Sequence, residues 1–180
     1  NKNSSKYLDE SFNLALKLIS DGVSNKIING PISKKHFLQD KFPGITEYLA
    51  HKSKTKNYAM LIYNNKLSVC PITTHIPLKD VHKKISKKKI IDKIQLIVSF
   101  YKTELKKNPI IAVTGLNPHC ESNFHNSEEK NIIIPSIKFL KKKGINVSGP
   151  FAADTIFLKS NYKKFDVIVG MYHDQVLTPI

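Results

Sequence analysis

The sequence predicts an α/β fold, in which a mixed sheet is flanked by helices. Short apolar segments typical of strands alternate with longer segments whose apolar residues recur at helical spacing. The clearest helix covers about 90–105, where the apolar residues share one face. The strand segments 58–63 and 67–73 are joined by 64–66, whose two asparagines tolerate the backbone of a tight hairpin, so this antiparallel pair would make the sheet mixed.

The first third of the chain is expected to begin with a helix over 6–20, with Ser5 as its N-cap. A short buried strand is expected at 27–29, because two isoleucines precede a Gly-Pro turn. A short helix is expected over 33–37, and a further helix begins at Thr46 after a Pro-Gly pair.

Strands and helices then alternate to the end of the chain. Pro77 is expected to open a helix, because its missing N–H costs nothing in the first turn. The strand 109–114 precedes a helix over 128–142, which should be interrupted or bent near Pro135. Two further strands are expected, at 145–148 and 166–171.

The composition is that of an ordinary globular protein. The chain has 180 residues, of which 41% are hydrophobic and 24% charged. We expect no membrane contact, because no apolar run approaches the ~18 residues of a transmembrane helix. The start has no secretory signal, and neither Cys70 nor Cys120 belongs to a CxxC pair, which favours a reduced, cytoplasmic setting. Neither chain end is typical of a domain boundary, so we expect an internal piece, incomplete at both ends.

The net charge of +15 raises nucleic acid as a possible partner. The cationic residues are nearly all lysines on expected helix faces and loops, without a zinc-finger or RNA-recognition motif. We therefore interpret them as a solvated surface and expect no specific nucleic-acid binding. A positive field would still attract a small phosphorylated substrate.

Three histidines directly follow strand-like segments, namely His75, His119 and His173. Ligands of α/β proteins bind beyond the carboxyl ends of the strands. Three imidazoles in that place could hold a divalent metal ion and leave positions open for substrate. The separations along the chain are too long to be a metal signature, so hydrogen-bonded structural histidines remain the alternative.

Four other residues have both a functional and a structural interpretation. Asp154 could be a helix N-cap or a carboxylate that deprotonates a substrate hydroxyl, and Asp174 could orient His173. Thr46 lies where free helix N–H groups suit phosphate or carboxylate, although capping alone would explain it. Lys34 follows a Gly-Pro turn and is either solvated or an anion contact. Neither GxGxxG nor GxxxxGK[ST] occurs, so a Rossmann or P-loop nucleotide site is not supported.

Seven segments form a specific set that covers nearly the whole chain: NGPISK at 29–34, FPGITEYLA at 42–50, TTHIPL at 73–78, GLNPH at 115–119, EE at 128–129, GPFAADT at 149–155 and MYHDQ at 171–175. In their order and spacing they resemble the PdxA family, the 4-hydroxythreonine-4-phosphate dehydrogenases. By this resemblance, residues 1–180 are the central part of such a dehydrogenase, without the start and end of the family fold.

The resemblance implies an isocitrate/isopropylmalate dehydrogenase-like fold and a homodimer with a divalent metal ion at its interface. It implies NAD-dependent oxidation of 4-phosphooxy-L-threonine with decarboxylation to 3-amino-2-oxopropyl phosphate, in pyridoxal phosphate (vitamin B6) biosynthesis. His75, His119 and His173 carry over as ligands of zinc, or of manganese, cobalt or magnesium. Thr46 carries over as a substrate contact and Asp154 as the aspartate near the substrate hydroxyl.

The sequence also departs from the family at two places. Ile45 stands where the family usually has a substrate-contacting histidine. After the NPH element, the segment 120–125 lacks the family's glycines, and only Glu121 keeps the pattern. Two alternatives therefore stay open: a paralogue that oxidises a threonate or erythronate phosphate, and a catalytically impaired homologue.

Overall fold

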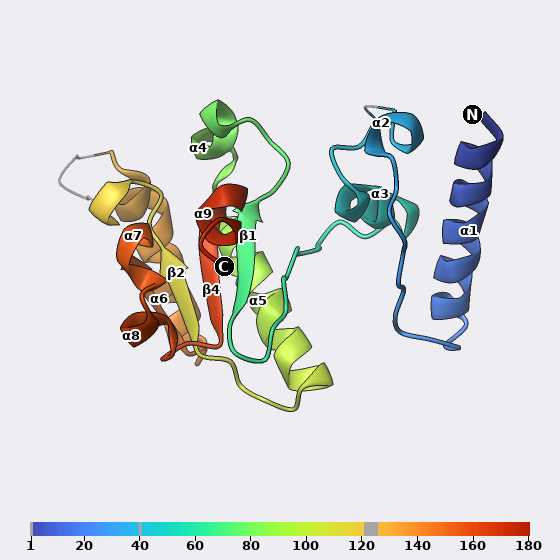
Figure 1. Ribbon diagram of the computed structural model, residues 1–180. Helices are drawn as coiled ribbons and strands as arrows, with labels where there is room; N and C mark the ends of the chain where they lie inside the picture. Colours follow the sequence, from blue (N-terminus) through green and yellow to red (C-terminus); the bar gives the residue numbers. More distant parts are fainter. Residues whose placement is uncertain (1, 40, 121–125) are drawn as a thin grey trace. The chain divides into compact units, whose positions relative to one another are not determined.

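The computed structural model describes residues 2–39, 41–120 and 126–180 (Figure 1). The chain divides into two compact units, Asn1–Lys56 and Asn57–Ile180. Each unit has its own hydrophobic core. Among the described helices, none has both the length and the apolar character needed to span a bilayer.

The first unit is helical, with helices α1 Lys2–Ser20, α2 Lys34–Phe37 and α3 Ile45–Lys52. Its core is aromatic. The ring of Tyr48 lies 5.3 Å from that of Phe12 and 5.0 Å from that of Phe37, measured between centroids, and both contacts are edge-to-face.

Two expectations for this unit are wrong. Helix α1 begins at Lys2, so Ser5 lies inside the helix and does not cap it. The segment 27–29 is not a buried strand: it has no regular structure, and Ile28 is 99% exposed. A strand needs a partner strand for its N–H and C=O groups. Residues 27–29 take part in none of the described strand pairings. Helix α3 begins one residue before Thr46, with Gly44 at the N-cap position.

The second unit is built on a sheet with the strand order β1-β4-β2-β3. Its strands are β1 Ser68–Thr73, β2 Ile111–Thr114, β3 Val147–Phe151 and β4 Val167–Tyr172. Each of the described neighbour pairs is parallel. The predicted α/β class is therefore confirmed.

The expected hairpin is reduced to one antiparallel bridge, between Ile62 and Val69. The residues before Ile62 lie against helix α5 (Lys87–Glu104) instead of extending along β1. Lys93 donates to the carbonyl of Tyr58 at 3.2 Å, and Ala59 packs against the core. The four named strands consequently form a parallel sheet rather than the mixed sheet that the sequence predicts.

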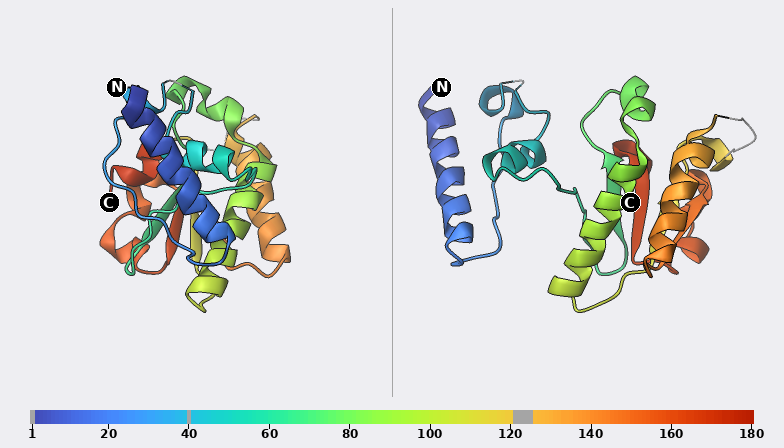
Figure 2. Two further views of the ribbon diagram at one scale, coloured as in Figure 1. Left: turned by 90° about the vertical axis from the view of Figure 1, so that its right-hand side faces the viewer. Right: turned by 180° about the vertical axis from the view of Figure 1, so that it is seen from behind.

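Helices cover both faces of this sheet (Figure 2). The helical elements described in this unit are η1 Leu78–Asp80, α4 Val81–Lys84, α5 Lys87–Glu104, η2 Pro118–Cys120, η3 Glu129–Ile133, α6 Ile134–Lys142, α7 Ala153–Ile156, α8 Lys159–Tyr162 and α9 His173–Leu177. Alternate strand residues face opposite sides. Val113 and Val169 join the core that includes α5 and α6, whereas Ala112 and Ile168 pack with Val176 of α9.

The expected interruption near Pro135 is present as a change of helix type. A π-helical turn, η3, precedes α6, and Pro135 lies in the first turn of α6. A proline has no N–H to donate, and the first turn is where that loss is tolerated. Pro77 similarly precedes the 3₁₀ turn η1.

Candidate functional site

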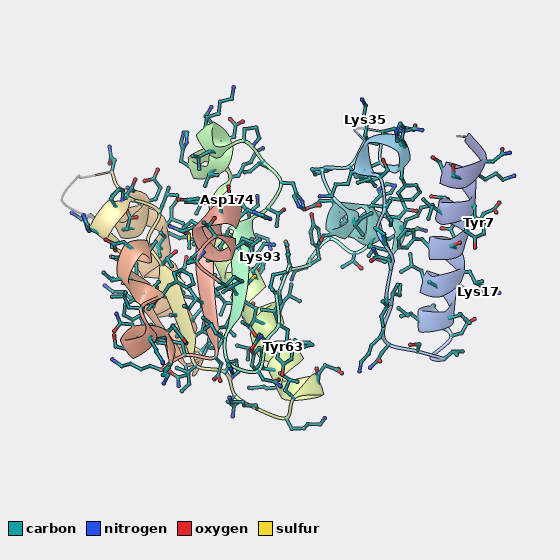
Figure 3. The ribbon with its side chains drawn as sticks, viewed as in Figure 1. Tyr7, Lys17, Lys35, Tyr63, Lys93 and Asp174 are labelled. Atoms are coloured by element: carbon teal, nitrogen blue, oxygen red, sulfur yellow. The ribbon has the colours of Figure 1, made fainter. Side chains whose placement is uncertain are left out.

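The carboxyl edge of the sheet gathers the three predicted histidines. His75 lies two residues after β1, His173 is the first residue of α9 after β4, and His119 lies in η2 after β2. The strands β1, β4 and β2 are parallel neighbours. All three histidines therefore lie at the edge where α/β proteins bind ligands. Asp174, which directly follows His173, also lies at this edge and is labelled in Figure 3.

The rings of His75 and His173 lie near each other. Their ring centroids are 5.8 Å apart, and both residues line a cavity of about 430 Å³. The Nδ1 atom of His173 lies 2.7 Å from Oδ1 of Asp174, as the sequence suggested. This contact orients the ring and leaves Nε2 for a ligand.

His119 pairs with Asp154 instead. Its Nδ1 atom lies 3.4 Å from Oδ2 of Asp154, and both side chains are more than half exposed. The backbone of His119 has a φ of 56°, in the left-handed region that non-glycine residues seldom adopt. Asp154 is not an N-cap, because it is the second residue of α7 and the N-cap position is occupied by Ala152, in extended conformation.

The donor atoms fit a divalent metal ion in kind, since imidazole and carboxylate are common ligands of such ions. In the part of the chain that the structure describes, however, no three His, Cys, Asp or Glu side chains are already gathered around one point. His75 and His173 approach each other, while His119 is turned to Asp154. The three-histidine metal site therefore stays a prediction.

The other predicted site residues lie in the first unit. Lys34 is the exposed first residue of α2. Ile45 and Thr46 are the first two residues of α3, and both are partly buried. Their roles toward a substrate stay predictions. Glu121 and the rest of 121–125 lie outside the described residues.

The sequence interpretation gave no role to two buried polar residues near the histidines, Glu129 and Gln175. Both belong to the segments that carry the family resemblance. The signal in the sequence is that these motifs place a glutamate and a glutamine close to residues that could bind a ligand. Their hydrogen bonds with the chain that leads to His119 became visible only in the structure.

A parallel sheet with ligand-type side chains beyond its carboxyl edge defines an α/β protein with a candidate ligand site at that edge. The model of the family described as "Pyridoxal phosphate biosynthetic protein PdxA" matches residues 1–180. The chain therefore belongs to the PdxA family, as the sequence motifs indicate. Its fold is the isocitrate dehydrogenase-like fold of the solved PdxA structures.

The relatives that are similar to this chain include proteins with two different enzyme names. A 4-hydroxythreonine-4-phosphate dehydrogenase from Sulfurihydrogenibium sp. (strain YO3AOP1) is 45% identical over 170 residues, which are 92% of this chain and 52% of the relative. A D-threonate 4-phosphate dehydrogenase from Pectobacterium atrosepticum is 35% identical over 169 residues, again 92% and 52%.

The crystal structure of a 4-hydroxythreonine-4-phosphate dehydrogenase from Klebsiella pneumoniae superposes with a TM-score of 0.81 at 35% identity. The match covers 93% of this chain and 53% of that one. The chain thus spans about half the length of the relatives it matches.

Proposed function

We propose that the chain is part of an NAD-dependent dehydrogenase that oxidises 4-phosphooxy-L-threonine and decarboxylates the product to 3-amino-2-oxopropyl phosphate, in pyridoxal phosphate biosynthesis. Membership of the PdxA family supports this reaction. The observation that carries the proposal is the position of His75, His119 and His173, which follow three neighbouring parallel strands at the carboxyl edge of the sheet, where α/β proteins bind ligands.

In this proposal the three histidines hold a divalent ion, either zinc or manganese, cobalt or magnesium. When bound, the ion would supply the lowering of the pKa of the substrate hydroxyl, and a nicotinamide would supply the hydride acceptor; the side chains supply neither. Asp154, next to His119, accepts the hydroxyl proton. Asp174 orients His173 through Nδ1. Lys34 and Thr46 bind the anionic groups of the substrate.

The proposal extends to the assembly. The family resemblance suggests a homodimer whose metal site lies at the interface, and the unpaired pattern of Cys70 and Cys120 suggests a cytoplasmic setting. The net charge of +15 then serves to attract a phosphorylated substrate and not nucleic acid.

A second candidate substrate is a threonate or erythronate phosphate. Ile45 supports it, because an isoleucine cannot make the hydrogen bond of the histidine usual at this position. The similarity to a D-threonate 4-phosphate dehydrogenase supports it as well.

NADH formation by the full-length enzyme tests these proposals. We expect turnover of 4-phosphooxy-L-threonine in the presence of Zn²⁺, Mn²⁺, Co²⁺ or Mg²⁺, and its loss in His119→Ala. The matched control is His82→Ala, which removes an exposed histidine from the same unit. Turnover of D-threonate 4-phosphate alone would identify the second candidate. Metal binding without turnover of either compound would indicate the catalytically impaired homologue.

A further inference from the structure

The backbone pairing between β2 and β4 ends before it reaches the histidines. The described register stops at the pair Val113 and Val169. Beyond this pair, the two chains continue to His119 and His173 respectively. The outer neighbours still hold each segment, since Gly115 donates to the carbonyl of Phe151 in β3 and Tyr172 pairs with Thr73 of β1. Between β2 and β4 themselves, no described ladder pair follows Val113 and Val169, so side-chain contacts connect the two segments directly.

The carboxamide of Gln175 bridges this gap. Its Oε1 atom accepts hydrogen bonds from the hydroxyl of Thr114 at 2.8 Å and from the backbone N–H of Met171 at 2.7 Å. Its Nε2 atom donates to the carbonyl of Gly115 at 2.8 Å. One buried side chain therefore connects the end of β2 with the end of β4 and with the helix that begins at His173.

Glu129 binds the next two residues of the same turn. Its Oε1 atom accepts from the backbone N–H groups of Leu116 at 2.7 Å and Asn117 at 2.8 Å, and Oε2 accepts from Nδ2 of Asn117 at 2.9 Å. Burial raises the pKa of this carboxyl, but the hydrogen bonds from Asn117 and Leu116 outweigh it and hold the pKa below its usual value. The carboxylate is therefore an anion that is stabilised by the hydrogen bonds of this turn.

We propose that Gln175 and Glu129 are positioning residues, which hold the turn 115–117 and so set the place of His119 relative to His173. The inference rests on the proposed function, in which both histidines serve one site. The left-handed backbone of His119 is a conformation that surrounding contacts must maintain. The hydrogen bonds of Gln175 with Gly115 and of Glu129 with Leu116 and Asn117 supply such contacts in the turn 115–117.

Substitution of Gln175 in the full-length enzyme tests the proposal. Gln175→Met keeps the length of the side chain and removes its three hydrogen bonds. The control is Tyr101→Phe, which removes a buried hydrogen bond of 2.9 Å to Ser68, at the opposite end of β1. The readouts are the affinity for Zn²⁺ alone, measured against a chelator, and amide exchange at 115–117.

For Gln175→Met we expect zinc affinity to fall by roughly 10- to 100-fold, as for other residues that orient metal ligands, and exchange at 115–117 to accelerate. Tyr101→Phe should lower the melting temperature without either effect. If both readouts of Gln175→Met match those of Tyr101→Phe, the positioning role is wrong.

Two further variants keep the test decisive if Gln175→Met does not fold. Gln175→Glu retains the acceptor for Thr114 and Met171 and loses the donor to Gly115, while Glu129→Gln weakens the bonds to Leu116 and Asn117. Both should accelerate exchange at 115–117, and unchanged exchange in both would overturn the proposal. A wild-type enzyme that binds none of Zn²⁺, Mn²⁺, Co²⁺ and Mg²⁺ would contradict the proposed metal site, whereas the exchange measurement would still decide the positioning role.

Discussion

The Nδ1 atom of His119 lies 3.4 Å from Oδ2 of Asp154, although the two residues follow different strands. His119 comes after β2 and Asp154 comes after β3, and these strands are parallel neighbours. Their carboxyl ends therefore lie side by side. The pair is exposed to solvent and hence accessible to a small substrate.

The first prediction concerns the proton acceptor. Asp154→Asn keeps the size of the side chain and removes its basic oxygen. Because general-base catalysis contributes about 10²- to 10⁴-fold, we expect kcat of the full-length enzyme to fall by that order. Steady-state NADH formation measures the change, and circular dichroism should show an intact fold. Asp21→Asn, an exposed aspartate after α1, is the control. A kcat within a few-fold of the wild type would exclude Asp154 as the base.

The second prediction concerns substrate choice at the start of α3. Ile45→His restores the residue that the family usually has at this position. If Thr46 and its neighbour contact the substrate, the new imidazole should raise kcat/KM for 4-phosphooxy-L-threonine relative to D-threonate 4-phosphate. The ratio of the two values measures the effect. Ile45→Gln introduces a polar side chain without an imidazole and serves as the comparison; an equal ratio in both variants would speak against a specific contact.

The third prediction concerns the packing of α9 on β4. A Cβ atom at Gly170 would lie 2.3 Å from Cγ1 of Val176 and 3.0 Å from Oε1 of Gln175. Gly170→Ala should therefore force α9 outward and lower the free energy of unfolding by about 1–3 kcal/mol. Urea unfolding measures this loss. The control is Gly30→Ala, because nothing lies within 4 Å of a Cβ atom there. Equal stability of the two variants would contradict the observed packing.

The fourth prediction concerns the pH response of the first unit. Two hydrogen bonds hold the pKa of Asp9 below its ordinary value of 3.8. The bond from Lys52 has the larger effect and the bond from Tyr48 the next largest. Burial raises the pKa of Tyr48, so its hydroxyl stays a donor. Because the folded pKa is depressed, the stabilisation is present above the ordinary pKa and disappears as the pH falls through the folded value.

An NMR titration of the Asp9 carboxyl in the full-length protein checks this prediction. Lys52→Met should move the pKa back toward 3.8. Lys6→Met removes an exposed lysine that pairs with Glu10 at 3.9 Å, and it should leave Asp9 unchanged. The same pKa in wild type and Lys52→Met would show that the ion pair does not form in solution.

Local patterns in the sequence were sufficient for most of the elements. Helix α5 and the strands β2 and β4 were predicted within a few residues, because each combines a clear apolar pattern with a capping or breaking residue. The segment 27–29 was mispredicted because an apolar pair resembles a strand whether or not a neighbouring strand exists. The predicted hairpin at 58–73 is reduced to a single bridge, because its first strand instead makes a contact between Tyr58 and Lys93, which are far apart in the chain.

By itself the sequence determined the α/β class, the family and the residues to consider at the site. It did so because apolar periodicity is local and the family motifs are contiguous. Tertiary structure alone decided that His75 approaches His173, that His119 faces Asp154, and that Gln175 connects their supporting strands. The order β1-β4-β2-β3 is responsible, since it makes neighbours of segments that are distant in the chain, and only neighbours can form hydrogen bonds.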